Sequence, residues 1–205
     1  MEYFNIAPVA SVIFVFTIIT SLYAFYDHSL YGKFMLHPYS VSRGHKFWTV
    51  ITSGLIHADW MHLIFNMYTF LMFSFKLERL MGSWRFALLY IVALILSDLP
   101  TIFKYKDNFN YNSLGASGAI SAVVFACILF DPLATYGIIF IPFVRVYAVI
   151  FGVLYLIYCV YASRNSRDGI NHDAHFFGAL TGLIFTIIFV PGILQNFITM
   201  LTGGR

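Results

Sequence analysis

The sequence predicts an all-α membrane protein, a bundle of six transmembrane helices with a long first loop at the membrane interface. Of its 205 residues, 60% are hydrophobic and 10% are charged, whereas a soluble domain carries about 25% charged residues. A water-soluble core of this size could not bury so much apolar surface, which includes 23 Phe and 14 Tyr. We therefore expect the lipid bilayer to solvate much of the chain.

Six apolar stretches come close to the length of about 20 residues that a membrane-spanning helix needs. They cover residues 6–26, 60–75, 84–99, 114–130, 145–162 and 174–190. The first lies in an uncharged run, residues 3–26, which is longer than the roughly 7–15 apolar residues of a cleaved signal peptide. We expect it to be a retained helix. No repeat divides the chain, and residues 1–205 are expected to form a single membrane domain.

The connections between these stretches differ in character. The first, residues 27–59, contains three basic residues and four histidines together with many aromatic residues, so we expect it to lie in the membrane interface. The third helix is expected to end near Pro100, because proline interrupts the backbone hydrogen bonds of a helix. An apolar segment rich in β-branched residues leads from Asp131 to Pro142 and is expected to be a connection.

Charge and cysteine content limit the possible functions. The net charge of +3 is scattered without a basic run, so we expect no nucleic-acid partner. Cys127 and Cys159 lie inside apolar stretches and are expected to be packed thiols rather than a disulfide or metal ligands. We expect no cofactor and no bound metal. The charges of the loops do not show in which direction the chain crosses the membrane. The sequence also leaves the oligomeric state open.

Polar residues inside spanning segments are costly and are therefore candidates for a functional site. Successive spanning helices alternate in direction, so the second, fourth and sixth all begin on the same side of the membrane. His62 and Asn66, Ser117, and His175 lie within the first two turns of these three helices. We therefore expect the three polar clusters to lie at a similar depth near one membrane face.

Ser117 and His175 have the residue types of a nucleophile and its base. A serine hydroxyl is a weak nucleophile at neutral pH and needs a neighbouring group to accept its proton. Histidine is the usual base, because its ordinary pKa of about 6.5 is close to working pH. The two side chains could act together if their helices pack closely.

Small residues on both helices favour such close packing. Gly178 and Gly182 form a small-xxx-small face just beyond the histidine, and Ser117, Gly118 and Ser121 form a similar face on the fourth helix. Small faces of this kind allow two helix backbones to approach each other in lipid.

Acyl transfer also needs hydrogen-bond donors aimed at the developing oxyanion. His62 and Asn66 are four residues apart and therefore lie on one face of their helix. Ser117 lies at a helix N-terminus, where free backbone N–H groups favour negative charge. Taken singly, a Gly-x-Ser-Gly sequence is more often a packing motif, a histidine at a helix start is more often interfacial, and Asn66 could simply join two helices. The combination favours a catalytic site.

Three motifs occur in the order and spacing of a known family. Residues 57–66 contain His57, His62 and Asn66 as His-x4-His-x3-Asn, residues 115–118 read Gly-Ala-Ser-Gly, and residues 174–182 read Ala-His-x2-Gly-x3-Gly. In these motifs the sequence resembles the rhomboid family of intramembrane serine proteases. The resemblance extends from the first loop to the sixth helix.

The resemblance implies a six-helix endopeptidase that hydrolyses peptide bonds in or near the transmembrane segments of other membrane proteins. It implies Ser117 as nucleophile and His175 as general base, and an oxyanion hole formed by His62, Asn66 and the backbone N–H of Ser117. Gly115 would let its loop approach the scissile bond. By the family's habit, the protein would lie in a bacterial inner membrane with its site towards the extracytoplasmic side.

The resemblance also implies supporting residues and a gate. His57, Gly118, Gly178 and Gly182 would support the site, and the fifth helix, here with Tyr147, Phe151 and Tyr155, would be a lateral gate for the substrate.

The sequence departs from the family at two positions. Members often have an aromatic residue four positions after the nucleophile, stacked on the catalytic histidine, whereas this chain has Ser121, which we expect could bond to His175 instead. Many members have Trp-Arg in the first loop, whereas here Trp48 precedes Thr49, which leaves the usual bracing of that loop open.

Two other functions compete with proteolysis. A catalytically inactive rhomboid-like protein would bind membrane clients, but such proteins typically lack the serine or the histidine. A histidine-ligated metal or haem protein could use His57, His62, His172 and His175, but it would explain neither Ser117 nor its neighbouring glycines.

Overall fold

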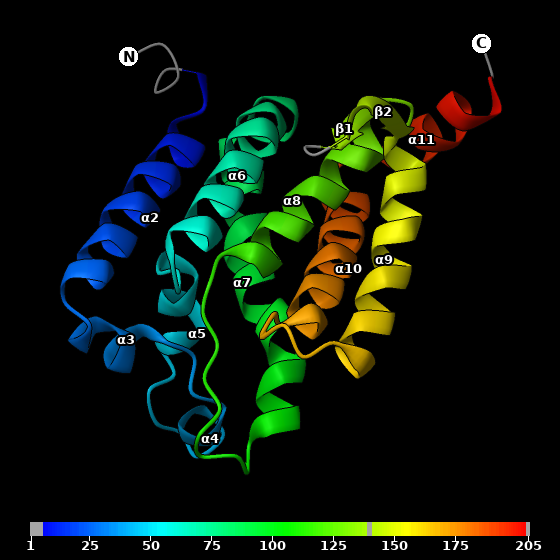
Figure 1. Ribbon diagram of the computed structural model, residues 1–205. Helices are drawn as coiled ribbons and strands as arrows, with labels where there is room; N and C mark the ends of the chain where they lie inside the picture. The colour runs from blue at the N-terminus through cyan, green and yellow to red at the C-terminus, as the bar shows by residue number, and fades with distance from the viewer. Residues whose placement is uncertain (1–5, 139–140, 204–205) are drawn as a thin grey trace.

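Long helices make up most of the protein, which a computed structural model describes over residues 6–138 and 141–203 (Figure 1). The long helices are α2 (Pro8–Tyr26), α6 (Trp60–Met81), α7 (Ser83–Tyr105), α8 (Ser117–Phe130), α9 (Ala148–Asn165), α10 (His172–Phe189) and α11 (Ile193–Thr202). Among the described residues, four of them (α2, α7, α9 and α10) are long and apolar enough to cross a membrane. The chain is therefore a mostly helical membrane protein, as the sequence predicts.

The first loop contains short helices rather than a single extended strand of chain. These are α3 (Ser29–Phe34), α4 (Pro38–Val41), α5 (Thr49–Thr52) and the 3₁₀ helix η1 (Ser53–Leu55). They lie at the lower end of the bundle in Figure 1, next to the loop that leads into α8. A short bridge between Leu36 and Ser113 joins these two loops.

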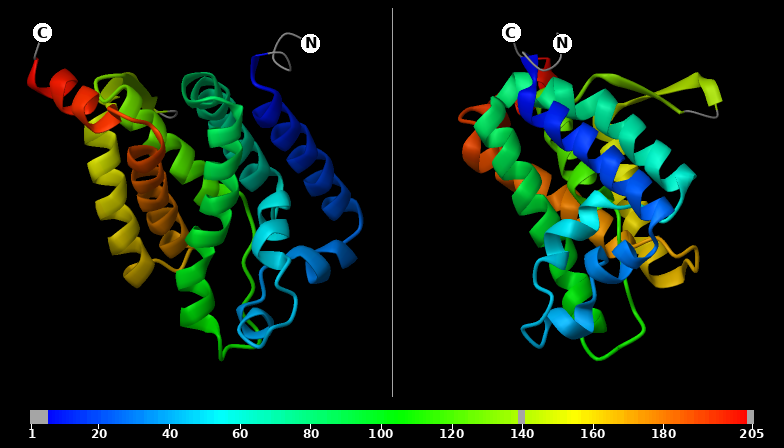
Figure 2. Two further views of the ribbon diagram at one scale, coloured as in Figure 1. Left: turned by 180° about the vertical axis from the view of Figure 1, so that it is seen from behind. Right: turned by 90° about the vertical axis from the view of Figure 1, so that its left-hand side faces the viewer.

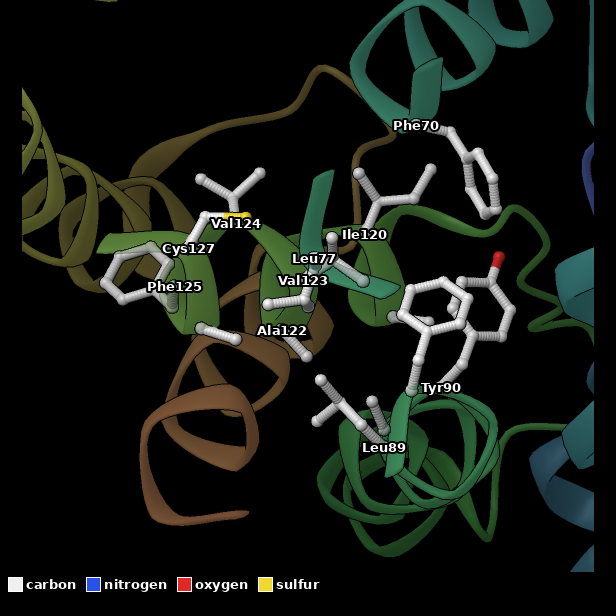
Figure 3. Packing of buried hydrophobic residues seen from close by; sticks show 14 of the residues in the cluster. Phe70, Leu77, Leu89, Tyr90, Ile120, Ala122, Val123, Val124, Phe125 and Cys127 are labelled. Atoms are coloured by element: carbon white, nitrogen blue, oxygen red, sulfur yellow. The ribbon is translucent and has the colours of Figure 1, made fainter. Parts of the chain in front are cut away.

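Helix α8 lies at the centre of the bundle and packs against α6, α7 and α10 (Figure 2). The helix has 14 residues, and every residue from Gly118 to Leu129 is buried. Figure 3 shows the apolar contacts around it, where Ile120 and Val123 of α8 lie near Phe70 of α6 and Leu89 of α7. Because α8 is short and the chain reaches it through a returning loop, its first residue lies inside the bundle.

Two predicted helix ends are wrong. The second helix was expected to end at residue 75 but continues as α6 to Met81, because Leu77, Glu78 and Met81 are buried and extend its packed face. The third helix continues through Pro100 to Tyr105. A proline removes one N–H donor, and the buried Thr101 and Ile102 hold the turn after it in place.

One hairpin departs from the all-α prediction. Strands β1 (Thr135–Ile138) and β2 (Ile141–Tyr147) pair antiparallel, with Thr135 opposite Tyr147. The fifth helix was expected from residue 145 but begins as α9 at Ala148, because residues 145–147 pair with β1 instead. β-branched residues favour this extended conformation. The hairpin lies at the opposite end of the bundle from the first loop (Figure 1).

A buried carboxyl group joins α2 to α6. The backbone N–H groups of Val9 and Ala10 donate to Oε1 and Oε2 of Glu78 at 3.1 and 2.7 Å. Glu78 is 1% exposed, so these amides are its main compensation for burial. The first N–H groups of a helix lack partners within the helix and favour a negative charge, which is why a glutamate is stable at this position.

The two thiols are free and buried, as the sequence predicts. Outside the core, α9 exposes a row of large apolar side chains that includes Ile150, Val153 and Ile157. An exposed apolar surface of this kind suits contact with lipid rather than water.

Candidate active site

The central contact of the site joins Ser117 and His175. Ser117 is the first residue of α8, and His175 lies in the first turn of α10. The hydroxyl Oγ of Ser117 is 2.7 Å from Nε2 of His175, close enough for the hydroxyl to donate a hydrogen bond to that nitrogen. The structure therefore brings together two side chains that lie 58 positions apart in the sequence.

Glycines allow this contact by bringing α8 and α10 together backbone to backbone. A Cβ atom added to Gly178 would lie 2.1 Å from the carbonyl oxygen of Gly118, and one added to Gly182 would lie 2.1 Å from that of Ala122. Gly118 is confined on another side, by α7, because its Cβ would lie against the side-chain Oγ of Ser97. Gly178 and Gly182 therefore face α8 as the sequence predicts, but they meet Gly118 and Ala122, whereas Ser121 of the expected face bonds to Tyr155 of α9.

His62 lies against the loop that precedes the serine. Gly115 has a φ of +115°, and a Cβ atom at this position would lie 2.7 Å from Cε1 and Nε2 of the His62 ring. The backbone N–H of Ala58 donates to Nδ1 of His62 at 3.4 Å. An accepting Nδ1 places the ring proton on Nε2, the nitrogen nearest Gly115. The imidazole can thus present a donor to the space beside the serine.

Asn66 lies in the same region but points its amide elsewhere. Its side chain is buried, and Nδ2 donates to the backbone oxygen of His62 at 2.9 Å. Among the hydrogen bonds of the described residues, none joins Asn66 to Ser117. Both residues nevertheless line one cavity.

His57 packs against His62 and supports its ring. Its ring is fully buried and packs edge-to-face on the ring of His62, with centroids 4.9 Å apart. Nδ1 lies 2.9 Å from the Ser21 hydroxyl of α2, and the backbone oxygen accepts a hydrogen bond from the Tyr31 hydroxyl. Burial lowers the pKa of His57 to about 3, so its imidazole is neutral at physiological pH.

Ser121 does not bond to His175 in the structure. Its hydroxyl shares a hydrogen bond of 2.8 Å with the Tyr155 hydroxyl of α9. The Tyr155 ring lies nearly parallel to the His175 ring, with an angle of 18° between the planes and 6.4 Å between the centroids. Sequence reasoning assigned Tyr155 to the fifth helix but missed its place beside the histidine.

A second histidine and an asparagine fix the start of α10. His172 packs edge-to-face on His175, and its Nε2 lies 3.1 Å from Oδ2 of Asp168. Asn171 caps the helix by accepting from the N–H of Ala174. The pKa of Asp168 is lowered to about 2, chiefly because the backbone N–H of Ile170 donates to its carboxylate. This carboxylate therefore stays ionised beside His172.

A mostly apolar cavity of about 240 Å³ opens beside the serine, between α6, α8 and α9. Its polar lining includes Asn66, Ser117 and Ser121, and its apolar lining includes Phe65, Val124 and Phe151. The cavity could therefore hold an apolar chain with a polar backbone at the serine. The described residues hold no group of three or more His, Cys, Asp or Glu placed to bind a metal ion.

These features define a class of protein: a helical membrane protein with a serine and a histidine in contact inside the bundle. The family model described as the Rhomboid domain matches residues 44–192, which is most of the chain. The chain belongs to the rhomboid family.

Several curated relatives carry the family's name. Rhomboid-related protein 1 of Caenorhabditis elegans is 25% identical over 186 residues, covering 89% of this chain and 50% of its own length. The rhomboid protease GlpG of Haemophilus influenzae is 28% identical over 169 residues, covering 82% of this chain and 65% of its own length. The Bacillus subtilis protein YdcA is 37% identical over 75 residues, covering 37% of each chain. The chain thus spans less than two thirds of the length of these relatives.

Proposed function

We propose that the protein is an intramembrane serine endopeptidase that hydrolyses peptide bonds in or near transmembrane segments of other membrane proteins. The observation that carries this proposal is the 2.7 Å contact between Ser117 Oγ and His175 Nε2. Ser117 is the nucleophile and His175 the general base. Among the hydrogen bonds of the described residues, no carboxylate bonds to His175, so the pair acts without an acidic third member.

The reaction follows the chemistry of acyl transfer. His175 Nε2 takes the hydroxyl proton as Ser117 Oγ bonds to the peptide carbonyl carbon, and the carbonyl oxygen becomes an oxyanion. The C–N bond then breaks, and the leaving amine takes the proton from His175. Water attacks the acyl-serine ester and gives a proton to the same imidazole, which returns it to Ser117 Oγ as the ester C–O bond breaks and the new carboxyl end is released.

Three donors can stabilise the oxyanion. The backbone N–H of Ser117 is at the N-terminus of α8, where helical partners are lacking. The His62 ring lies against Gly115. Asn66 can turn its amide from the His62 carbonyl into the cavity that it shares with Ser117. Removal of one such donor typically costs about 10²–10³ in kcat.

The membrane arrangement belongs to the same proposal. Helices α2, α6, α7, α8, α9 and α10 are proposed to form six spans, with the short α8 inside the bundle. The substrate would enter the apolar cavity past α9 from the bilayer. The first loop and the start of α8 would face the extracytoplasmic side of a bacterial inner membrane.

Cleavage of a panel of transmembrane substrates by the purified protein in liposomes tests the proposal. Ser117→Ala and His175→Ala are each expected to lower the rate by at least about 10³-fold, with unchanged folding. Ser83→Ala, at the opposite end of the bundle, is the matched control. A fluorophosphonate probe should label Ser117 in the native protein and fail to label His175→Ala.

Two results would contradict proteolysis by this pair. One is full activity in either variant. The other is substrate binding by the unsubstituted protein without cleavage or labelling, which would favour an inactive, client-binding protein.

A further inference from the structure

Tyr155 is the residue of α9 that reaches both the nucleophile helix and the histidine. Its hydroxyl bonds to Ser121, one helical turn after Ser117. Its ring lies nearly parallel to the ring of His175. The rings of Phe125 and Phe151 pack on it from α8 and from its own helix, with centroids 5.6 and 5.8 Å away.

The imidazole of His175 needs a contact of this kind. The glycine contact fixes the backbone of α10 but leaves the histidine side chain free to turn about its own bonds. His172 meets one edge of the ring, and Ser117 holds Nε2. The Tyr155 ring lies nearly parallel to the imidazole with 6.4 Å between the centroids, so it limits the space into which the imidazole could turn away from the serine.

Helix α9, which carries this tyrosine, is the least buried of the four candidate spanning helices in the described part of the chain. Of the 18 residues of α9, 22% are buried, compared with 44% of the 18 residues of α10. Its buried residues are Ala148, Gly152, Cys159 and Ala162. Among the described residues, one side-chain hydrogen bond joins α9 to another helix, and it is the bond between Tyr155 and Ser121. The position of the tyrosine ring therefore depends on how α9 docks.

We propose that Tyr155 is a positioning residue for His175, and that its bond to Ser121 sets the ring against the imidazole when α9 is docked on α8. The proposal rests on the proposed proteolysis at Ser117. It makes the alignment of the base depend on a helix that borders the substrate cavity, so that the reactive geometry is complete only while α9 is in place.

Fluorophosphonate labelling of Ser117 in the full-length protein in liposomes provides the test, together with kcat and KM for a transmembrane substrate. Tyr155→Leu should lower kcat and the labelling rate about 10²-fold, the cost expected for a misplaced catalytic group, with little change in KM. Tyr155→Phe keeps the ring and should lose roughly 3–10-fold, the worth of one hydrogen bond. The control is Tyr161→Leu, the same change at an exposed position of α9.

A double-mutant cycle separates positioning from a general loss of stability. Ser121→Ala should match Tyr155→Phe, and the double variant should lose no more than either single variant, because both remove the same bond. Additive losses would overturn the proposal, and this arm holds even if Tyr155→Leu fails to fold. Labelling of folded Tyr155→Leu at the native rate would also overturn it.

These outcomes are distinct from failure of the proposed function. If Ser117 is not labelled in the native protein, the proposed proteolysis at Ser117 is wrong, whatever Tyr155 does. If the native protein is labelled and Tyr155→Leu behaves like Tyr161→Leu, only the role of Tyr155 fails.

Discussion

Helix α8 meets two neighbours in different ways. Against α10 the backbones touch, and a Cβ atom at Gly178 would lie 2.1 Å from a carbonyl oxygen. Against α9 the contact is made by side chains, and a Cβ atom at Gly152 would lie 3.1 Å from the flexible end of Ile128. Backbone atoms cannot give way as a side-chain methyl group can, so the first interface has one arrangement and the second can adjust.

The difference matches the division of work in the proposed reaction. The nucleophile and the base lie on the two helices that touch, so the distance between their backbones is fixed by the close approach at Gly178 and Gly182. The cavity lies on the side of α9, where the proposed substrate would enter. A hydrolase inside a membrane needs both properties, and here α8 is the boundary between them.

The largest effect is expected from Gly178→Ala. The added methyl group has no room against the Gly118 carbonyl, so we expect a loss of about 3 kcal/mol in unfolding free energy or failure to fold. Gly152→Ala is the matched control and should cost less than about 1 kcal/mol, because the Ile128 side chain can move. Thermal unfolding in detergent measures both. Equal losses would show that the two interfaces do not differ.

A smaller effect, on catalysis more than on folding, is expected from Gly115→Ala. Its methyl group would displace the His62 ring, and we expect kcat to fall by about 10²–10³, as for loss of an oxyanion donor. Gly82→Ala is the control for backbone strain, since Gly82 also has a positive φ, +84°, but has open space around it. If the two variants lose the same activity, the His62 contact does not matter.

The smallest effect concerns His57, at the edge of the fixed part of the site. Its folded pKa of about 3 lies below the ordinary value of about 6.5. Between these values the unfolded state binds more protons, so this group's contribution to stability is complete above about pH 6.5 and is lost as the pH falls towards 3. His57→Gln should therefore flatten the fall of the unfolding midpoint between pH 7 and pH 4.

The control for this experiment is His45→Gln, at an exposed histidine in the first loop. It should leave the pH profile of the native protein unchanged. The same slope in native protein and His57→Gln would show that another group causes the pH dependence.

The sequence predicts the fixed part of the site better than the adjustable part. The alternating direction of the helices places Ser117, His62 and His175 at one end, and the small residues at positions 118, 178 and 182 indicate which helix faces meet. These signals are local or follow from counting helices, and the structure brings the same residues together.

The contact between Ser121 and Tyr155 has no such signal. It depends on how far α9 is rotated about its own axis, and α9 is apolar on all sides, so no face is marked in the sequence. The hairpin was missed for a related reason. A short apolar segment with β-branched residues can be strand or loop, and only pairing with a partner decides between them.

The buried carboxyl group of Glu78 has a consequence for how the chain is made. Its partners, the N–H groups of Val9 and Ala10, are synthesised 68 or more residues earlier. During that interval the growing chain has α2 without α6, so the amides of its first turn lack the carboxylate that they bind in the finished protein. These two hydrogen bonds between the first two long helices can therefore form only after α6 has been synthesised.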